Sequence, residues 1–500
     1  MRPLIQEIQT PHTPETLVEQ LQHGEERGRQ VVLLRTGSFD SPSARYSFVA
    51  ANPFLIFRSF GSRCEIMPGA SSRTPDVHFG NPWQVLDALL ARCEVWDEMD
   101  LPFPVGGALG YWGYDLKNFL EPKLPRRALH DLELPDCHVG FYPSLMVFDH
   151  ALGKVFGVAT GLNADGSRSE KTAREQLEFW TNAASRFSAP ARPGAPFPPS
   201  AARLGRAPVR SNFSRAGFLD AVKRAQQYIR TGHIYQVNLS HRLTVEAGMA
   251  GWEFFQRLHA VSPAPFAAFF DCGDFQLASS SPELFLRLSG AHLVTRPIKG
   301  TRPRGADPTR DAQLAYELQT SAKELAELVM ITDLLRNDLG KFCEFGSVQT
   351  PEIARLEKFA AVQHLVSTVE GRLRPGVTHL AALAACFPGG SVTGAPKFRA
   401  MEIIDELEPV ARGPYCGAHG YLGFNRESQL SITIRTAVCT REKIHFHVGA
   451  GIVADSQPEA EYQETLDKAA GFLAALAPGP AQPAASARER FEVVKEPDFP

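Results

Sequence analysis

Three arginines and one lysine gather in the stretch from Arg296 to Gly305, which is the first candidate for chemistry. No acidic residue follows until Asp307. The prolines and glycines of this stretch predict a loop, because proline lacks a backbone donor and glycine weakens regular elements. A loop of this kind suits an anionic ligand and favours the neutral form of Lys299. A solvated basic turn fits the composition equally well.

Two pairs of glutamates have the spacing of one helical face. Helices are predicted over Ser321 to Leu335 and over Glu459 to Leu476, and each carries two glutamates three residues apart. Carboxylates at this spacing repel one another unless a cation lies nearby. Two such faces would form an all-oxygen site that suits Mg²⁺, although glutamate pairs are also common on exposed helices. The four residues are Glu324, Glu327, Glu461 and Glu464.

An arginine and a glycine-rich segment form a third candidate. The stretch from Ser431 to Thr440 alternates in polarity, so a strand there would direct Arg435 away from the apolar face. The next predicted strand ends in Gly449-Ala450-Gly451, whose backbone N–H groups can approach a ligand carboxylate. Taken alone, the pattern also fits an edge arginine followed by a tight turn.

Three further positions depend on context. Glu283 lies at the entrance of a predicted strand, where a turn carboxylate facing water is the alternative, and His364 has the apolar neighbours of a core histidine. The glycine-rich segment from Pro388 to Lys397 contains Ser391 and opens a helix, so it is a candidate anion site. It is not a phosphate-binding P-loop, because lysine and then serine or threonine do not follow Gly394.

These candidate residues lie in a chain with the composition of an ordinary globular protein. The chain has 500 residues, of which 44% are hydrophobic and 21% charged. A net charge of −3 argues against nucleic-acid binding. Eight scattered cysteines predict a reducing compartment and no structural zinc. Without a signal sequence or a run of membrane-spanning length, we expect a cytoplasmic protein with no membrane partner.

Changes in composition suggest four segments. Residues 1–187 form a predicted N-terminal α/β region, and the proline- and alanine-rich residues 188–210 form a predicted linker. Residues 211–477 alternate strands and helices and hold every candidate described above. Residues 478–500 are predicted to be a disordered tail.

Taken in order, these stretches resemble the chorismate-utilising enzyme family, which includes anthranilate, aminodeoxychorismate, isochorismate and salicylate synthases. The resemblance is dense over about residues 215–475, the predicted chorismate-binding catalytic domain. It is looser before the linker, through Ala44 to Phe48 and Gly106 to Asp115. It implies an α+β fold like that of anthranilate synthase component I, with two facing antiparallel sheets, helices outside, and the site between the layers.

Two positions choose among the branches of the family. Water-adding members carry a lysine base where this chain has Gln236, and glutamine cannot deprotonate water, so the resemblance implies ammonia as the nucleophile. Aminodeoxychorismate synthases carry a lysine at the position of Lys299, whereas anthranilate synthases carry a small residue there. The implied reaction converts chorismate and ammonia to 4-amino-4-deoxychorismate, for p-aminobenzoate and folate synthesis.

Two alternatives remain. Within the family, the chain could form anthranilate for tryptophan synthesis, and Lys299 is the residue that discriminates. From another class, it could be a silent chorismate-binding protein, which the intact candidate residues disfavour.

The chemistry gives a reason for the lysine. Chorismate must exchange its C4 hydroxyl for an amine with retention of configuration. A covalent Lys299 intermediate at C2 joins two displacements with allylic shift, and the second brings ammonia to C4. Lys299 must be neutral to attack, which desolvation and the neighbouring Arg296 and Arg302 favour.

The family pattern assigns the remaining roles residue by residue. Glu283 matches the general acid, and His364 matches an acid/base histidine whose duty is open without pyruvate elimination. Glu327 and Glu464 match direct Mg²⁺ ligands, with Glu324 and Glu461 as the water-mediated pair. The groups that match substrate contacts are Gln236, Ser391, Tyr415, Arg435, Gly449, Ala450, Gly451 and Lys468.

The resemblance also bears on partners and regulation. No cysteine lies in a Gly-x-Cys-x-Gly elbow, so we expect a separate glutamine amidotransferase subunit to supply ammonia. No lyase domain follows, so release of aminodeoxychorismate is expected. Feedback-regulated anthranilate synthases carry Leu-Leu-Glu-Ser where this chain has Leu33-Leu34-Arg35-Thr36, so tryptophan feedback is not expected.

Overall fold

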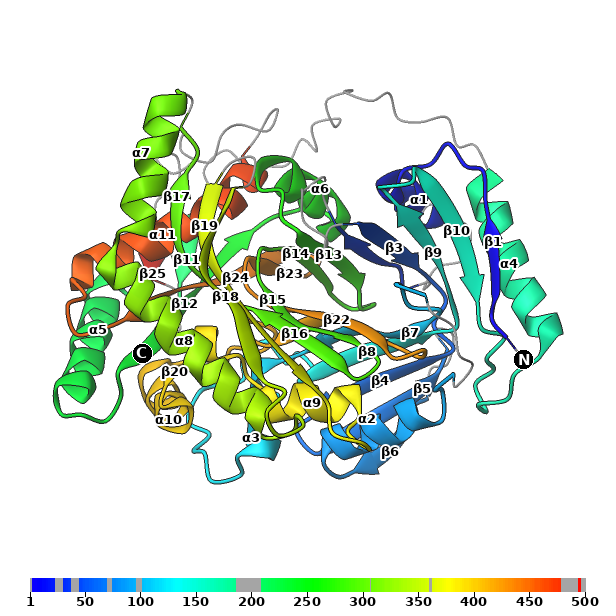
Figure 1. The fold of residues 1–500 in the computed structure, drawn as a ribbon, viewed down its shortest axis with the longest axis horizontal. Helices are drawn as coiled ribbons and strands as arrows, with labels where there is room; N and C mark the ends of the chain where they lie inside the picture. Colours follow the sequence, from blue (N-terminus) through cyan, green and yellow to red (C-terminus); the bar gives the residue numbers. More distant parts are fainter. Residues whose placement is uncertain are drawn as a thin grey trace.

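The computed structural model describes residues 2–22, 30–36, 45–69, 74–95, 101–185, 208–305, 307–358, 362–477 and 493–495. Two large sheets dominate the described chain (Figure 1). Their strands pair antiparallel except where β11 meets β25 in parallel. The predicted α+β fold with two antiparallel sheets is therefore confirmed.

The first sheet has 13 strands. In spatial order they are β1 (Leu4–Glu7), β10 (Lys154–Ala159), β9 (Ser144–Asp149), β3 (Tyr46–Ala50), β2 (Val32–Arg35), β13 (Phe266–Asp271), β14 (Gln276–Ser281), β23 (Thr436–Cys439), β24 (Lys443–Ile452), β12 (Gln236–Glu246), β11 (Val209–Ser211) and β25 (Val493–Lys495), with β20 (Gly394–Ala395) also pairing with β12.

The second sheet has 12 strands. In spatial order they are β17 (Ile298–Pro303), β19 (Val362–Arg372), β16 (His292–Arg296), β15 (Leu284–Ser289), β22 (Glu427–Ile432), β21 (Ala418–Gly423), β7 (Gly107–Trp112), β8 (Cys137–Tyr142), β4 (Leu55–Phe60), β5 (Arg63–Pro68) and β6 (Asp76–Phe79), with β18 (Gln349–Lys358) pairing with the other edge of β19.

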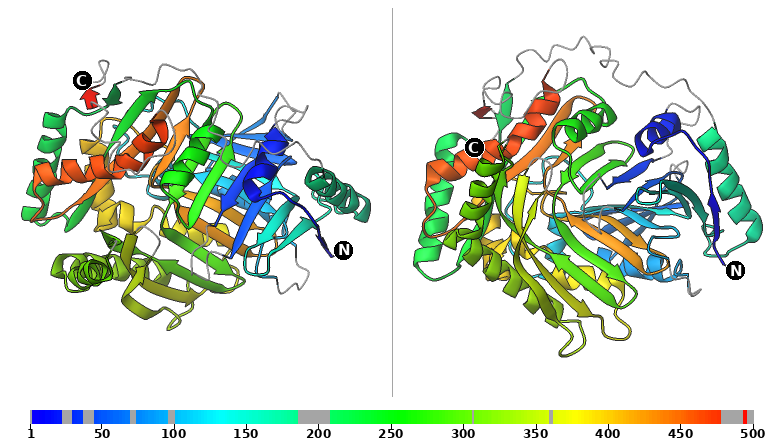
Figure 2. Two further views of the ribbon diagram at one scale, coloured as in Figure 1. Left: turned by 90° about the horizontal axis from the view of Figure 1, so that it is seen from above. Right: turned by 45° about the horizontal axis from the view of Figure 1, so that its top comes forward.

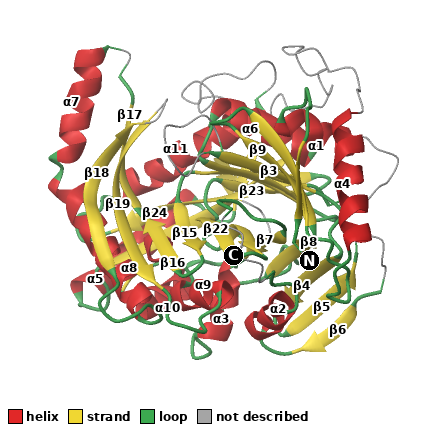
Figure 3. Cartoon of the chain, turned by 45° about the vertical axis from the view of Figure 1, so that its right-hand side comes forward, coloured by secondary structure: helices red, strands yellow, loops and turns green. Residues whose placement is uncertain are grey.

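Helices surround the sheets (Figure 3). They are α1 (Pro14–Gln22), α2 (Pro82–Ala91), α3 (Lys117–Leu120), α4 (Glu170–Ser185), α5 (Arg215–Arg230), α6 (Gly251–Val261), α7 (Pro308–Gln319), α8 (Ala322–Gly340), α9 (His379–Cys386), α10 (Lys397–Leu407) and α11 (Pro458–Leu476), with short 3₁₀ turns η2 (Tyr114–Leu116) and η3 (Gly390–Val392).

Apolar side chains fill the space between the sheets and beneath the helices. One buried cluster joins Phe48 and Phe270 of the first sheet to Leu109 and Tyr421 of the second, so the two sheets face one another. A second cluster packs α1, α4, α6 and α11 on the outer face of the first sheet. Burial of these faces is the main driving force that holds the two layers together.

Both sheets combine strands from before and after the predicted linker. In the first sheet β2 pairs with β13, and in the second β7 pairs with β21. Figure 2 shows the blue N-terminal strands beside green strands from the middle of the chain. The predicted linker lies outside the described residues except for 208–210. Within the predicted tail, residues 493–495 form β25, and the remainder lies outside the described residues.

The helices that carry the candidate glutamates form where periodicity places them. α8 begins after Ser321, whose hydroxyl accepts a hydrogen bond from the Glu324 N–H, and it extends beyond the predicted end to Gly340. α11 begins at Pro458, a favoured first helical residue, and ends at Leu476 as predicted. No helix in the described ranges is long and apolar enough to cross a membrane.

Candidate active site

The basic stretch from Arg296 to Gly305 is not a loop. Its first residue ends β16 and most of the rest forms β17, which pairs with β19. A register shift between Lys299 and Thr301 leaves Gly300 at a φ of +66°. A side chain at Gly300 would also meet Leu318 at 2.6 Å. The glycine therefore marks a bulge within a sheet edge rather than a turn.

The arginines of this stretch are all paired with carboxylates from later elements of the chain. Arg296 forms an ion pair with Glu357. Arg302 Nη1 lies 3.6 Å from Glu324 Oε1, and the Arg304 guanidinium binds Asp311. The charges of these arginines are therefore compensated within the fold, so the predicted anion-binding loop is wrong for them.

Lys299 is different. Its Nζ lies 3.4 Å from the carbonyl oxygen of Ser391, and the lysine forms no ion pair with any carboxylate in the described ranges. The carboxyls of Glu283, Glu327 and Glu464 all lie close enough to feel its charge. The amine is therefore half-buried at the centre of the candidate carboxylates.

Glu283 lies between β14 and β15 and is 7% exposed. Burial raises the pKa of its carboxyl, while the Ser391 hydroxyl, the charge of Lys299 and the Ile298 N–H oppose the shift without cancelling it. A carboxyl with a raised pKa keeps more of its proton near neutrality, which suits a proton donor. Glu283, Lys299 and Ser391 thus converge from three separate elements.

His364 joins the same region from β19. It is 7% exposed, and its Nδ1 lies 2.9 Å from the Thr301 hydroxyl on the paired strand. Burial lowers the pKa of His364, and the charge of Arg435 adds to the effect. The imidazole is therefore a neutral group that borders the site.

Arg435 lies between β22 and β23 rather than inside one continuous strand. Its φ of +51° breaks the predicted strand, and its Nη1 donates to the Lys468 carbonyl oxygen at 2.8 Å. Burial lowers the pKa of Arg435, which Tyr415 and Glu464 oppose. The guanidinium therefore lies near Tyr415, Glu464 and Lys468, and its further N–H groups can donate to a ligand carboxylate.

The segment Gly449-Ala450-Gly451 lies near the end of β24, and the alternative of a tight turn there is wrong. Ala450 pairs with Leu239 of β12, and the Gly449 carbonyl accepts a hydrogen bond from Lys468 on the opposite edge. Because amide direction alternates along a strand, the amides of Gly449 and Gly451 point away from β12. These two amides, and not that of Ala450, face the same way as Lys468.

Tyr415 and Gln236 bracket this segment. A side chain at Gly449 would meet the Tyr415 hydroxyl at 2.9 Å, and one at Gly451 would meet Gln236 Nε2 at 2.5 Å. Gln236 is 2% exposed, and its Oε1 has no hydrogen-bond partner among the described residues. A buried acceptor without a partner is costly in a purely structural position.

Lys468 links this segment to the carboxylates. Its Nζ lies 2.8 Å from the Gly449 carbonyl oxygen and 2.7 Å from Glu464 Oε1. Burial lowers the pKa of Lys468, and Glu464 opposes that shift. Burial also raises the pKa of Glu464, but Lys468 and the lysines beyond it outweigh burial and bring it below its ordinary value.

The four glutamates of α8 and α11 lie toward one another. Burial raises the pKa of Glu327, and Glu324 and Glu464 add to the shift. Burial likewise raises the pKa of Glu461, with a contribution from Glu464. Mutual repulsion across two helices shows that negative charge is not fully compensated here.

These carboxylates fit a hard divalent cation by donor type and by charge. Their oxygens do not form a closed ligand shell. Glu324 forms an ion pair with Arg302, and Glu464 forms one with Lys468. Within the described ranges, only Asp115, His130 and Asp136 bring three ligand atoms within 4.8 Å of one another, away from this site.

One charged residue of the site was missed from the sequence. Lys323 on α8 lowers the pKa of Glu327, Glu461 and Glu464, so it lies among the carboxylates. Its position four residues before Glu327 on one helical face was a readable signal.

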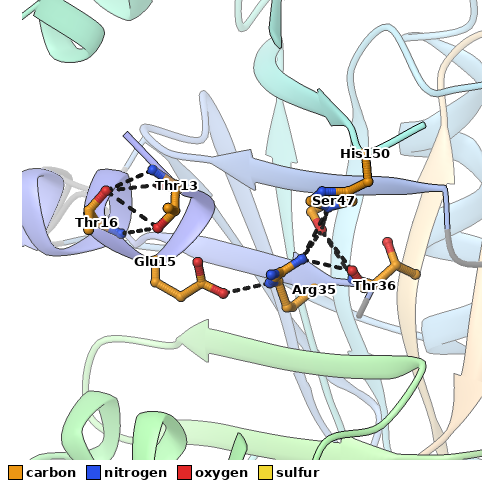
Figure 4. A network of polar contacts seen from close by, with 7 residues as sticks. All are labelled: Thr13, Glu15, Thr16, Arg35, Thr36, Ser47 and His150. Atoms are coloured by element: carbon orange, nitrogen blue, oxygen red, sulfur yellow. Dashed lines mark hydrogen bonds and ion pairs between the residues drawn. The ribbon is translucent and has the colours of Figure 1, made fainter. Parts of the chain in front are cut away.

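The N-terminal segment Leu33-Leu34-Arg35-Thr36 contributes to a separate polar network around Arg35 (Figure 4). Arg35 Nε binds the Glu15 carboxylate, and its Nη1 lies 2.8 Å from the Thr36 carbonyl oxygen and 3.2 Å from Ser47 Oγ. Ser47 also contacts His150 Nε2 at 2.7 Å. The arginine charge is therefore compensated inside the network.

Comparison with known proteins identifies one family, with relatives of two different names. A family described as chorismate binding enzyme matches residues 39–474. Anthranilate synthase component 1 of Thermus thermophilus is 45% identical over 75% of this chain and 79% of that protein. Aminodeoxychorismate synthase component 1 of Salmonella typhimurium is 40% identical over 87% of this chain and 91% of that protein. Anthranilate synthase component I of Streptococcus pneumoniae is a solved structure with a TM-score of 0.71 and 30% identity, covering 91% of this chain and 96% of that one.

Proposed function

The chain belongs to the chorismate binding enzyme family, and on this premise we propose that it converts chorismate and ammonia to 4-amino-4-deoxychorismate. The observation that carries the proposal is the meeting of Lys299, Glu283 and Ser391. The reaction needs a nucleophile that attacks the ring and an acid that protonates the leaving group. The Lys299 amine and the Glu283 carboxyl, whose pKa is raised, can supply these two functions side by side.

In the proposed reaction, Lys299 Nζ attacks C2 of chorismate while the ring double bonds shift. The C4 hydroxyl leaves as water after it takes the proton of Glu283. Ammonia then attacks C4, the double bonds shift back, and the lysine amine is expelled. Both displacements take place on the same face of the chorismate ring, so the configuration at C4 is retained.

The two carboxylates of chorismate would be held at opposite ends of the site. Arg435, Tyr415 and the amides of Gly449 and Gly451 would bind the enolpyruvyl carboxylate. Mg²⁺ held directly by Glu327 and Glu464, and through water by Glu324 and Glu461, would neutralise the ring carboxylate when bound. Lys468 spans the two ends, and Gln236 offers an acceptor that cannot activate water.

The proposal includes a partner and a location. We infer that a glutamine amidotransferase subunit supplies the ammonia, as the product lies on the route to p-aminobenzoate and folate. A cytoplasmic location is supported by the cysteines, all eight of which are free and buried. His364 is proposed as a neutral acid/base or hydrogen-bonding group, since the reaction has no pyruvate elimination.

A second candidate is anthranilate synthesis, because a 45% identical relative is named anthranilate synthase component 1. It would require ammonia to attack C2 directly, without Lys299 as nucleophile. The presence of an amine at Lys299, half-buried among the carboxylates, favours the aminodeoxychorismate route.

Product identity tests the proposal. The purified chain is given chorismate, Mg²⁺ and ammonium at alkaline pH, and the products are separated and weighed by mass spectrometry. A product that keeps the enolpyruvyl group and carries an amine in place of the hydroxyl supports the proposal. Anthranilate with pyruvate would replace it with the second candidate, and unchanged chorismate would favour a silent binding protein.

A further inference from the structure

A fully buried ion pair lies behind the proposed site. The side chains of Arg412 and Glu408 are 1% and 4% exposed. They meet through two hydrogen bonds, from Nη2 to Oε1 at 2.7 Å and from Nε to Oε2 at 2.8 Å. Apolar residues of similar volume often stabilise a core at least as well as a buried ion pair, so stability alone explains the pair poorly.

The other hydrogen bonds of the pair go to the backbone beside proposed site residues. Arg412 Nη1 donates to the carbonyl of Val392, next to Ser391, at 2.9 Å. Its Nη2 also donates to the carbonyl of Asn238, on the strand that begins with Gln236, at 2.7 Å.

Glu408 completes the connection to this strand. Its Oε1 accepts hydrogen bonds from the Ser240 N–H at 2.8 Å and from the Ser240 hydroxyl at 2.9 Å. The carboxylate and the guanidinium therefore hold two successive outward-facing backbone groups of β12, at Asn238 and Ser240. A strand held at two points cannot shift relative to the Ser391 turn without breaking the ion pair.

The guanidinium also orders a ring that faces the site. Its central carbon lies 5.7 Å from the ring centroid of Tyr415 and 4.7 Å from that of Tyr114. Burial opposes the charge of Arg412, but the Glu408 carboxylate outweighs burial and holds the arginine pKa well above its ordinary value. The guanidinium therefore remains charged.

We propose that Arg412 and Glu408 are positioning residues for the reaction, because the pair fixes the Ser391 turn against β12 and Tyr415. It acts through Ser391, whose hydroxyl donates to Glu283. The inference rests on the proposed function only for its substrate, chorismate, since the same alignment would serve amination at C2 or C4.

Arg412→Lys tests the proposal with the charge retained. A lysine ammonium is a single point that cannot reach both Glu408 oxygens and two carbonyls at once. The measurement is loss of chorismate, whatever the product, with Mg²⁺ and a fixed concentration of free-base ammonia over a range of pH. Arg58→Lys is the matched control, because Arg58 binds the buried Glu65 between β4 and β5, away from the site.

We expect Arg412→Lys to lower kcat by about tenfold or more in fully folded protein, since small misplacements of reacting groups are costly. KM for chorismate should change less, because the carboxylate contacts remain. The alkaline limb of the kcat profile should move to higher pH, as in Ser391→Ala, because the lost Ser391 hydrogen bond normally lowers the pKa of Glu283. Arg58→Lys should keep the wild-type kcat and limb.

The outcomes separate the two proposals. Wild-type kcat and an unmoved limb in folded Arg412→Lys, or equal losses in Arg58→Lys, would overturn the positioning role alone. Anthranilate as the wild-type product would overturn the proposed function alone, with the positioning role still decided by the two variants. A wild-type protein that leaves chorismate intact would overturn both.

Discussion

The proposed site and the Arg35 network are both polar clusters at least partly buried in the fold, yet the pKa values of their carboxyls shift in opposite directions. Burial raises the pKa of Glu15, but Arg35 and nearby N–H and hydroxyl groups outweigh it and leave it below its ordinary value. Burial of Glu283, Glu327 and Glu461 is not outweighed, so their pKa values stay raised. Burial thus leaves the carboxyl pKa lowered in one region and raised in the other. The reason is that Glu15 pairs directly with the Arg35 cation in its network.

The difference separates groups that hold the fold from groups available to a ligand. In the Arg35 network the cation meets its anion directly (Figure 4). In the proposed site, Arg435 is bound to a carbonyl and Gln236 retains an acceptor without a partner in the described ranges. Incomplete compensation of this kind is typical of functional sites.

Lys299→Ala should have the largest effect on activity. Without the amine, formation of aminodeoxychorismate should fall by about 10³-fold or more, because the covalent route is lost. Direct attack of ammonia at C2 would then leave anthranilate as the residual product. Mass analysis of the products checks both points, and an undiminished yield of aminodeoxychorismate would exclude Lys299 as nucleophile.

Glu283→Gln should come next, because it removes a proton donor and keeps the shape of the side chain. We expect kcat to fall by about 10²–10⁴-fold, the usual contribution of general acid catalysis. The matched change Glu15→Gln in the Arg35 network should leave kcat unchanged. Steady-state kinetics on both variants measures the difference. Equal losses of kcat would show that the two regions do not differ in their role in catalysis.

Glu327→Gln tests the contrast between the proposed site and the Arg35 network through metal binding. In wild-type protein, Mg²⁺ at a hundred times its dissociation constant should stabilise the fold by about 2.7 kcal/mol. Most of this should be lost in the variant. Thermal unfolding with and without Mg²⁺ measures it, and full Mg²⁺ stabilisation of the variant would place the metal elsewhere.

The same variant should behave differently without metal. Since the folded-state pKa of Glu327 is raised, wild-type stability falls as pH rises from its unfolded to its folded pKa. Glu327→Gln should therefore be slightly more stable than wild type at neutral pH in chelator. A less stable metal-free variant would show that the carboxylate is compensated after all.

The smallest effect is expected from Glu15→Gln on stability. Because the folded-state pKa of Glu15 is lowered, its contribution is present above the unfolded pKa and disappears as pH falls through the folded pKa. We expect the variant to lose about 0.5–1 kcal/mol of unfolding free energy at neutral pH, as for other partly exposed pairs. Denaturant titrations at several pH values measure the loss, which should vanish in acid.

Sequence periodicity was sufficient for the helices that carry the glutamates. The apolar stripe and the cap at Ser321 locate α8, and Pro458 locates the start of α11. It was not sufficient for β17, because the strand is stabilised by pairing with β19, some sixty residues later, which no local pattern encodes. The same limit explains Arg296, whose partner Glu357 lies on β18 and comes near because β16 and β18 both pair with β19.

Backbone geometry at the site was also beyond the sequence. Alternation predicted one strand through Arg435, but its left-handed conformation separates β22, in one sheet, from β23, in the other. The crossing between sheets, not local propensity, sets this bend. The sequence left a tight turn open at residues 449–451, whereas the close approach of Tyr415 and Gln236 explains the glycines inside a strand.

The interleaving of the two sheets has a consequence for synthesis on the ribosome. β2 and β7 emerge early, but their neighbours β13 and β21 appear only after a large part of the chain has been translated. Until then these apolar strands have open edges that invite pairing with other nascent chains. The proposed proton donor Glu283, the proposed nucleophile Lys299 and helix α11 also follow β2 and β7 in the chain. Translation must therefore pass β21 before both of these edges are covered, and it must pass α11 before the proposed site is complete.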